Sequence, residues 1–247
     1  MAGLDWLTAR PVAHRGLHDA AAGVIENTAT AFQAAITGRY GIECDVQISA
    51  DGEAMVHHDG TLGRLTEGSA RLDAMTTAEL AQVAFKATAD RMLTLGELCD
   101  LVAGRVTLLV EIKSRHDADP RLPRRVAEVL QSYAGPVAAM SFDPRQIVAL
   151  REAAPGLPRG IVAERRYHAE CAGLTSGERR ALAHLAHVGS TRPHFVAYRV
   201  GDLPTAATWL ARHLFGLPLL TWTVRSAEDR ARAARFADQI IFEGFRP

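Results

Sequence analysis

The 247-residue sequence has few cysteines, no long apolar run and no excess of charge of either sign. Its three cysteines, Cys44, Cys99 and Cys171, lie far apart and form no CxxC pair, which argues against a disulfide framework. No apolar stretch reaches the roughly 18 residues of a membrane span, and the N-terminus lacks the apolar segment of a secretory signal. Lys plus Arg and Asp plus Glu both total 28, unlike the basic balance of a nucleic-acid binder. We therefore expect a cytoplasmic protein without stable membrane insertion or a nucleic-acid partner.

The amino-acid composition suits a folded domain. Hydrophobic residues make up 48% of the chain and charged residues 23%, which is enough apolar material for a sizeable core. We find no internal repeat, low-complexity tract or linker that would divide the chain. The sequence therefore predicts one domain over residues 1–247, a length that suits an α/β barrel.

Strand-like and helix-like segments alternate along the chain. Strands are predicted at 11–16, 41–49, 105–113, 136–142, 159–164, 194–200, 218–224 and 238–244. A helical pattern follows each of the first seven, at 27–38, 94–104, 121–133, 143–153, 176–188, 205–215 and 226–236. Eight βα-type units favour a closed (β/α)8 TIM barrel, and a doubly wound open sheet is the alternative.

One predicted strand, GIECDVQIS at 41–49, carries two acids that alternate with apolar residues. Glu43 and Asp45 are two positions apart and therefore point to the same side of the strand. Glu111 and Lys113 repeat this spacing in the next barrel strand. Polar residues near the C-terminal strand ends of a barrel gather at one rim, so three carboxylates could form an oxygen site for Ca²⁺ or Mg²⁺. The alternative is a buried ion network in which Lys113 and Arg15 neutralise the acids.

Two of the ten histidines end strands close to these acids. His14 follows the first predicted strand, and His58 ends a strand at 54–59 that returns beside the acidic one. Histidine is the usual acid/base group near neutral pH, although capping and packing roles suit these positions equally well. Most of the others, including His18 and His116, are interpreted as loop or surface residues.

Several short motifs occur in a distinctive order: VAHRG (12–16), ENT (26–28), IECDVQISADG (42–52), VHHDGTLGRLT (56–66), LTLGEL (93–98), VEIK (110–113), SFD (141–143) and WTV (222–224). Together they resemble the glycerophosphodiester phosphodiesterase family, of the bacterial, cytoplasmic type. The resemblance implies a TIM barrel with a short insertion after the second strand. Here the insertion would span about 50–92 and hold the return strand at 54–59 and a short helix near 76–86.

The resemblance also implies a reaction and its main groups. The reaction is metal-dependent hydrolysis of a glycerophosphodiester to glycerol 3-phosphate and an alcohol. His14 and His58 would be the catalytic acid and base, in an undetermined order. One divalent cation, Ca²⁺ or Mg²⁺, would be held by Glu43, Asp45 and Glu111.

The same comparison places substrate-binding groups around the phosphate. Arg15 and Lys113 would meet its charge, and Trp222 would line the pocket. Glu26, from the ENT motif, would support Arg15. A metal-dependent lyase or isomerase acting on a phosphorylated small molecule remains an alternative, as does a catalytically silent phosphodiester-binding module.

Departures from the family pattern leave some positions open. His57 precedes His58 where an apolar or aromatic residue is usual, and we expect His58 to be the functional one because neighbouring residues point to opposite sides. The last strand ends in Phe242-Glu243 where a Thr-Asp pair is common, so the role of residues 239–247 is open. Residues 165–200 match poorly. The released alcohol, the metal and the oligomeric state are not determined by the sequence.

Overall fold

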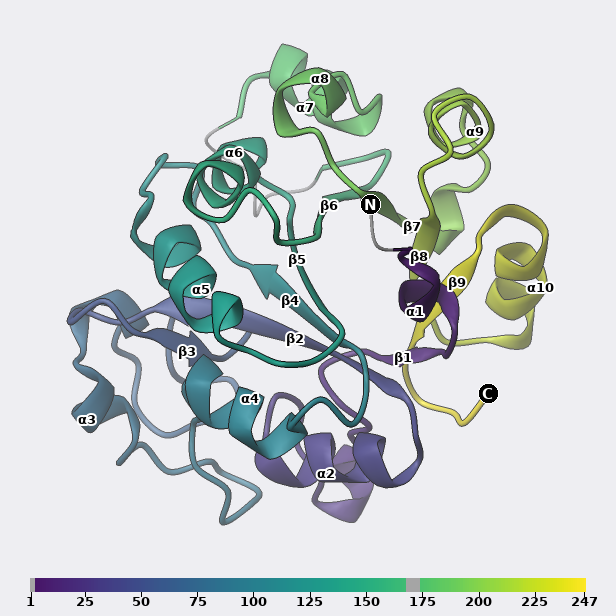
Figure 1. The fold of residues 1–247 in the computed structure, drawn as a ribbon. Coiled ribbons are helices and arrows are strands. Elements are labelled where there is room, and N and C mark those ends of the chain that lie inside the picture. The colour runs from purple at the N-terminus through teal and green to yellow at the C-terminus, as the bar shows by residue number, and fades with distance from the viewer. Residues whose placement is uncertain (1–2, 168–173) are drawn as a thin grey trace.

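A computed structural model describes residues 3–167 and 174–247. Within them, eight parallel strands form a closed barrel (Figure 1). These strands are β1 (Val12–Ala13), β2 (Gly41–Ile48), β4 (Leu108–Ile112), β5 (Val137–Ser141), β6 (Arg159–Ala163), β7 (Phe195–Arg199), β8 (Leu219–Val224) and β9 (Gln239–Phe242). The barrel closes because β1 pairs with both β2 and β9. The predicted TIM barrel is confirmed, and the open-sheet alternative is wrong.

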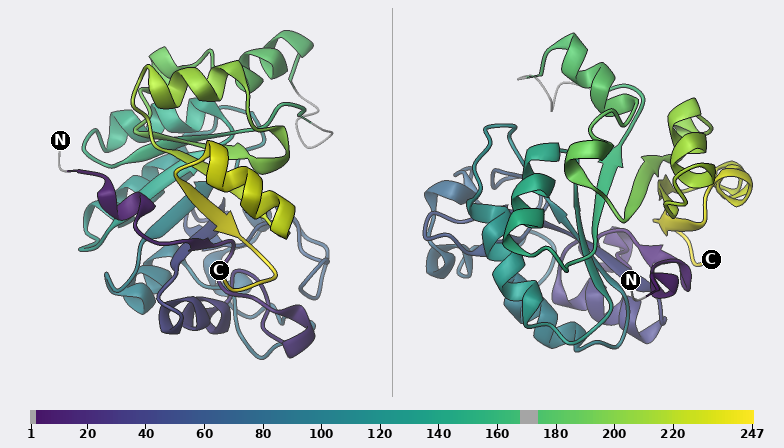
Figure 2. Two further views of the ribbon diagram at one scale, coloured as in Figure 1. Left: turned by 90° about the vertical axis from the view of Figure 1, so that its right-hand side faces the viewer. Right: turned by 45° about the horizontal axis from the view of Figure 1, so that its top comes forward.

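Helices surround the strands, as two further views also show (Figure 2). They are α1 (Asp5–Thr8), α2 (Ala29–Thr37), α3 (Thr77–Leu80), α4 (Leu95–Val102), α5 (Arg121–Gln131), α6 (Pro144–Ala153), α7 (Ser176–Ala183), α8 (Val188–Thr191), α9 (Ala206–His213) and α10 (Ala227–Phe236). Short 3-10 turns occur at η1 (Ala20–Ala22), η2 (Leu72–Ala74) and η4 (Val200–Asp202). The helix predicted within 176–188 corresponds to α7. A separate short helix, α8, begins at the end of that range. No helix of the described residues is long and apolar enough to cross a membrane.

The predicted insertion follows β2. It contains β3 (Ala54–Val56), which pairs antiparallel with β2, and then η2 and α3. Its apolar residues form a small core together with Ile25 from the segment before α2; this core is made of Ile25, Met55, Leu62, Leu72, Leu80, Phe85 and Met92. This packing holds the return strand, and with it His58, beside the rim of the barrel.

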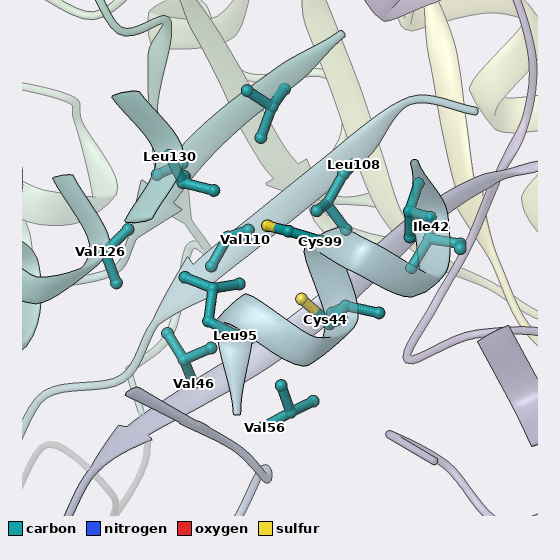
Figure 3. Packing of buried hydrophobic residues seen from close by; sticks show 14 of the residues in the cluster. Ile42, Cys44, Val46, Val56, Leu95, Cys99, Leu108, Val110, Val126 and Leu130 are labelled. Atoms are coloured by element: carbon teal, nitrogen blue, oxygen red, sulfur yellow. The ribbon is translucent and has the colours of Figure 1, made fainter. Parts of the chain in front are cut away.

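The outer face of β2 is apolar, as its alternation predicts. Ile42, Cys44 and Val46 are fully buried and pack outside the barrel with side chains of β4, α4 and α5 (Figure 3). Cys44 and Cys99 are free and buried, whereas Cys171 lies outside the described residues. With these side chains outside, the intervening Glu43 and Asp45 point into the barrel.

The lower end of the barrel interior, where the strands begin, is closed by α1. Leu7 is fully buried in a cluster with inward residues of the strands, among them Leu109 and Phe195. The hydroxyl of Thr107, just before β4, donates to the carbonyl of Trp6 (3.2 Å), and Gln239 Nε2 of β9 donates to the carbonyl of Thr8 (2.7 Å). This short helix was not predicted from the sequence.

Candidate active site

Three carboxylates meet at the upper, C-terminal end of the interior. Parallel pairing of β2 with β4 sets Asp45 beside Glu111, and Glu43 lies one inward position earlier on β2. One oxygen of each lies within 4.8 Å of the others, and the three residues are 1%, 1% and 7% exposed. Burial, with repulsion from Asp45 and Glu111, raises the pKa of Glu43 well above its usual value. Within the described residues Glu43 Oε1 is buried without a hydrogen-bond partner.

Two positively charged side chains, Lys113 and Arg15, contact these acids. Lys113 Nζ lies 2.8 Å from Asp45 Oδ1 and 2.5 Å from Glu111 Oε1. Arg15 Nε lies 3.1 Å from Asp45 Oδ2, and the backbone N–H of Arg15 donates to Glu43 Oε2 (2.9 Å). Although burial alone would raise it, the charges of Lys113 and Arg15 lower the pKa of Asp45. The contacts of the alternative ion network are therefore present.

This ion network does not engage all the oxygen atoms of the three carboxylates. Three carboxylates face two cationic side chains, and among residues 3–167 and 174–247 one buried oxygen, Glu43 Oε1, has no hydrogen-bond partner. Hard divalent cations take oxygen ligands, and a bound ion would account for the buried oxygen that has no hydrogen bond. Glu43, Asp45 and Glu111 therefore fit such an ion.

The two predicted histidines open onto the same cavity as the acids. Nδ1 of His14 lies 2.8 Å from Glu243 Oε2, and its Nε2 lies 4.0 Å from Glu43 Oε2. Burial lowers the pKa of His14, opposed by the hydrogen bond with Glu243. Nδ1 of His58 lies 2.7 Å from Asp59 Oδ1. In both histidines, Nδ1 is therefore the ring nitrogen that contacts a carboxylate.

The cavity that these groups share has a volume of about 460 Å³. Phe142 and Trp222 form part of its wall, in edge-to-face contact with ring centroids 5.3 Å apart. Of the residues predicted for the site, those that line the cavity are His14, Arg15, Glu43, His58, Glu111, Lys113 and Trp222. Asp45 and Glu26 are next to these but do not line the cavity, and neither does His57, which is buried. Glu26 Oε1 accepts a hydrogen bond from Arg15 Nη1 (2.7 Å), the contact predicted for it.

Supporting residues that the sequence analysis did not select surround this centre. Asn27 binds Asp45 twice, through Nδ2 to Oδ2 (2.9 Å) and through Oδ1 from the backbone N–H (3.2 Å). Arg64 donates to Asp59 Oδ2 (2.6 Å) and to Glu26 Oε1 (2.7 Å). Asn27 and Arg64 both lie in quoted motifs, ENT and GRLT, so the motifs themselves were the available signal.

Two histidines interpreted as loop or surface residues prove to lie at the site. His116 lines the cavity, its side chain is only 7% exposed, and its Nδ1 is 3.5 Å from Asp143 Oδ2. Nε2 of His18 lies 4.0 Å from Glu243 Oε2. Both are loop residues, as expected, but these loops fold inward over the barrel rim, which local periodicity does not reveal.

The fold and the site together define a class of protein. A (β/α)8 barrel with histidines, carboxylates and cations at the C-terminal rim is a barrel enzyme equipped for acid/base chemistry on an anionic substrate. Comparison with known proteins gives the family. The sequence model of the Glycerophosphoryl diester phosphodiesterase family matches residues 14–242. The chain belongs to this family and is a phosphoric diester hydrolase.

Individual relatives agree with this assignment. A glycerophosphodiester phosphodiesterase of Caldanaerobacter subterraneus is 29% identical over 231 residues, 90% of this chain and 88% of the relative. The crystal structure of a putative glycerophosphoryl diester phosphodiesterase from Silicibacter pomeroyi superposes with a TM-score of 0.77 at 26% identity, over 94% of this chain and 89% of the other. A phosphodiesterase of Oleispira antarctica, solved with the product sn-glycerol-3-phosphate, gives 0.77 at 18% identity, over 96% and 94%, and supports the fold.

Proposed function

We propose that the protein hydrolyses glycerophosphodiesters to glycerol 3-phosphate and an alcohol. The observation that carries the proposal is that His14 and His58, each bound to a carboxylate through Nδ1, open onto one cavity with an acidic cluster and two cations. The product bound in the Oleispira antarctica relative supports glycerol 3-phosphate as the phosphorylated product. The cytoplasmic location and the single domain over residues 1–247 stay predictions from the sequence.

The substrate phosphate would lie between the histidines. Arg15 and Lys113 would bind its non-bridging oxygens, and Trp222 would contact the organic part. One histidine would accept a proton from the attacking water as the oxygen of that water forms the new P–O bond. The other would donate a proton to the alcohol oxygen as the old P–O bond breaks. General acid–base help of this kind typically gives about 10²–10⁴-fold in rate.

The acidic cluster completes the proposed site. Glu43, Asp45 and Glu111 would hold one divalent cation, Ca²⁺ or Mg²⁺, both of which prefer oxygen ligands. When bound, such a cation supplies Lewis-acid stabilisation of the charge on the phosphate. Lys113 would then be available to bind the phosphate, because the acids would be neutralised without it.

The test is a product assay on a panel of substrates. We expect glycerol 3-phosphate to be released from glycerophosphocholine, with no conversion of sugar phosphates. A chelator should abolish the release, and added Ca²⁺ or Mg²⁺ should restore it. Turnover of a sugar phosphate alone would support the lyase or isomerase alternative, and bound metal with no turnover of any phosphodiester would support a silent binding module. Full activity in excess chelator would refute the metal site.

A further inference from the structure

The last strand delivers a carboxylate to the catalytic rim. β9 ends at Phe242, whose carbonyl accepts a hydrogen bond from the backbone N–H of His14 (2.9 Å), so the residues after β1 and β9 leave the barrel side by side. The next residue, Glu243, is fixed on its other side by its backbone N–H, which donates to the carbonyl of Val224 (3.0 Å). Barrel closure therefore brings Glu243 to His14 across 229 positions of sequence.

The carboxylate of Glu243 binds two groups through one oxygen. Oε2 lies 2.8 Å from His14 Nδ1 and accepts a hydrogen bond from Arg225 Nη2 (2.9 Å). The side chains of His14 and Glu243 are 13% and 23% exposed, so water competes little for this contact. An ionised carboxylate can only accept, so the ring nitrogen that faces it carries the proton. Nε2 of neutral His14 is then left with a free lone pair, inside the cavity.

We propose that Glu243 is the positioning residue of His14, holding its ring in place and fixing the tautomer with the proton on Nδ1. The proposal rests on the proposed function, in which Nε2 of His14 exchanges a proton with the substrate. Arg225 in turn holds the carboxylate of Glu243.

The second histidine has a matching arrangement, built from unrelated sequence. His58 Nδ1 lies 2.7 Å from Asp59 Oδ1, and Asp59 Oδ2 accepts a hydrogen bond from Arg64 Nε (2.6 Å). Each proposed catalytic ring is therefore backed by a carboxylate and then by an arginine. The same series of contacts, from histidine to carboxylate to arginine, thus occurs twice. Packing alone would not require this repetition, so it supports a positioning role for both carboxylates.

The same atoms allow a competing interpretation as a metal site. Ligand atoms of His14, His18 and Glu243 lie within 4.8 Å of one another, and His18 Nε2 is buried without a hydrogen-bond partner in the described residues. However, the guanidinium of Arg225 already occupies Glu243 Oε2. A fixed positive charge on the shared oxygen disfavours a second cation there. The contacts therefore favour positioning over metal binding.

The experiment compares Glu243→Gln and Glu243→Asp with the wild type. Glu228→Gln is the control, because Glu228 is 83% exposed and pairs only with Arg232 among the described residues. Steady-state kinetics on glycerophosphocholine separate kcat from KM, and ¹⁵N NMR of the imidazoles, assigned with His14→Ala, reports the tautomer of His14. Thermal melting confirms that each variant is folded.

We expect Glu243→Gln to lower kcat by about 10–100-fold, the usual range for a group that orients a catalytic residue from behind, with little change in KM. The His14 signals should lose the pure Nδ1–H pattern. Glu243→Asp, which keeps the charge, should recover part of kcat, and Glu228→Gln should match the wild type.

Other outcomes overturn the proposal in distinguishable ways. An inactive His14→Ala beside a fully active Glu243→Gln with unchanged His14 signals would remove the positioning role but keep the proposed function. Altered His14 signals with unchanged kcat would instead refute the catalytic role of His14. A rise in KM alone would make Glu243 a substrate-binding residue. A second equivalent of bound metal, lost in Glu243→Gln but kept in Glu43→Gln, would establish the competing metal site.

Discussion

The two ends of the barrel interior are built from the same strands but differ in chemistry. On β4, Leu109 and Glu111 both point inward, two positions apart. Leu109 belongs to the apolar cluster closed from below by Leu7, whereas Glu111 belongs to the charged cluster at the rim. One pleat of the strand, about 7 Å, separates the two environments. The fold therefore divides the interior into an end that stabilises it and an end available for chemistry.

The energetics of the two ends are expected to differ. Each apolar side chain removed from water at the lower end stabilises the fold by about 1.5–3 kcal/mol. At the upper end three buried carboxylates repel one another and lose hydration, a cost that contacts with Lys113 and Arg15 oppose. Substitutions at the lower end should therefore change stability alone, and substitutions at the rim should mainly change turnover.

The largest effect is expected at the rim histidines. His14→Ala and His58→Ala should each reduce kcat by about 10²–10⁴-fold, because each would remove a proposed acid/base group. The free energy of unfolding should change little, since both side chains face the cavity. Kinetics and urea denaturation measure the two quantities, with the exposed His184 changed to Ala as control. Near-normal turnover of either variant would show that the histidine is not catalytic.

The lower end should give the opposite result. Leu7→Ala leaves a cavity in a fully buried position and should lower the free energy of unfolding by about 2–5 kcal/mol. Its kcat, measured well below the melting temperature, should equal that of the wild type. The matched control is Leu214→Ala, because Leu214 is 66% exposed and its removal should cost no more than about 0.5 kcal/mol. A clear fall in kcat for Leu7→Ala would mean that the two ends are coupled.

Sequence reasoning predicted these two ends unequally. The strands, their order and the three acids could all be predicted, because alternation along a strand and the position of strand ends are local properties. Helix α1 was not, since four residues are too few for a helical period to show. The contact of Glu243 with His14 depends on how the barrel closes, which no local pattern contains. The pairing of Lys113 and Arg15 with the acids was foreseen as the alternative ion network, because all five residues lie at or next to predicted strand ends.

Glu43→Gln tests whether the rim costs stability. In the presence of chelator at pH 7 we expect this variant to be more stable than the wild type, although inactive. The folded-state pKa of Glu43 is raised, so below the unfolded value of about 4.3 the carboxyl is protonated in both states and costs nothing. As the pH rises above 4.3 only the unfolded chain ionises freely, and the wild type loses stability that the Gln variant keeps.

Urea denaturation at pH 4 and pH 7 measures this difference. The stability gap between Glu43→Gln and the wild type should widen from the lower to the higher pH. The exposed Glu228→Gln should show no such gap. A variant less stable than the wild type at pH 7, or a gap that does not depend on pH, would mean that Lys113 and Arg15 compensate the acids fully.

The smallest effect is expected at Trp222, where the apolar cluster meets the rim. Its ring packs on Phe142, and its Nε1 donates to the carbonyl of Ala197 (3.2 Å). Trp222→Phe keeps an aromatic wall but loses this hydrogen bond, which should cost about 0.5–1.5 kcal/mol of stability. We expect KM to rise while kcat stays within about twofold, because in the proposed site the ring would contact the substrate equally before and during reaction. A fall in kcat without a change in KM would instead show that Trp222 acts with the reacting groups. Trp222 would then belong to the charged rim and not to the border between the two ends.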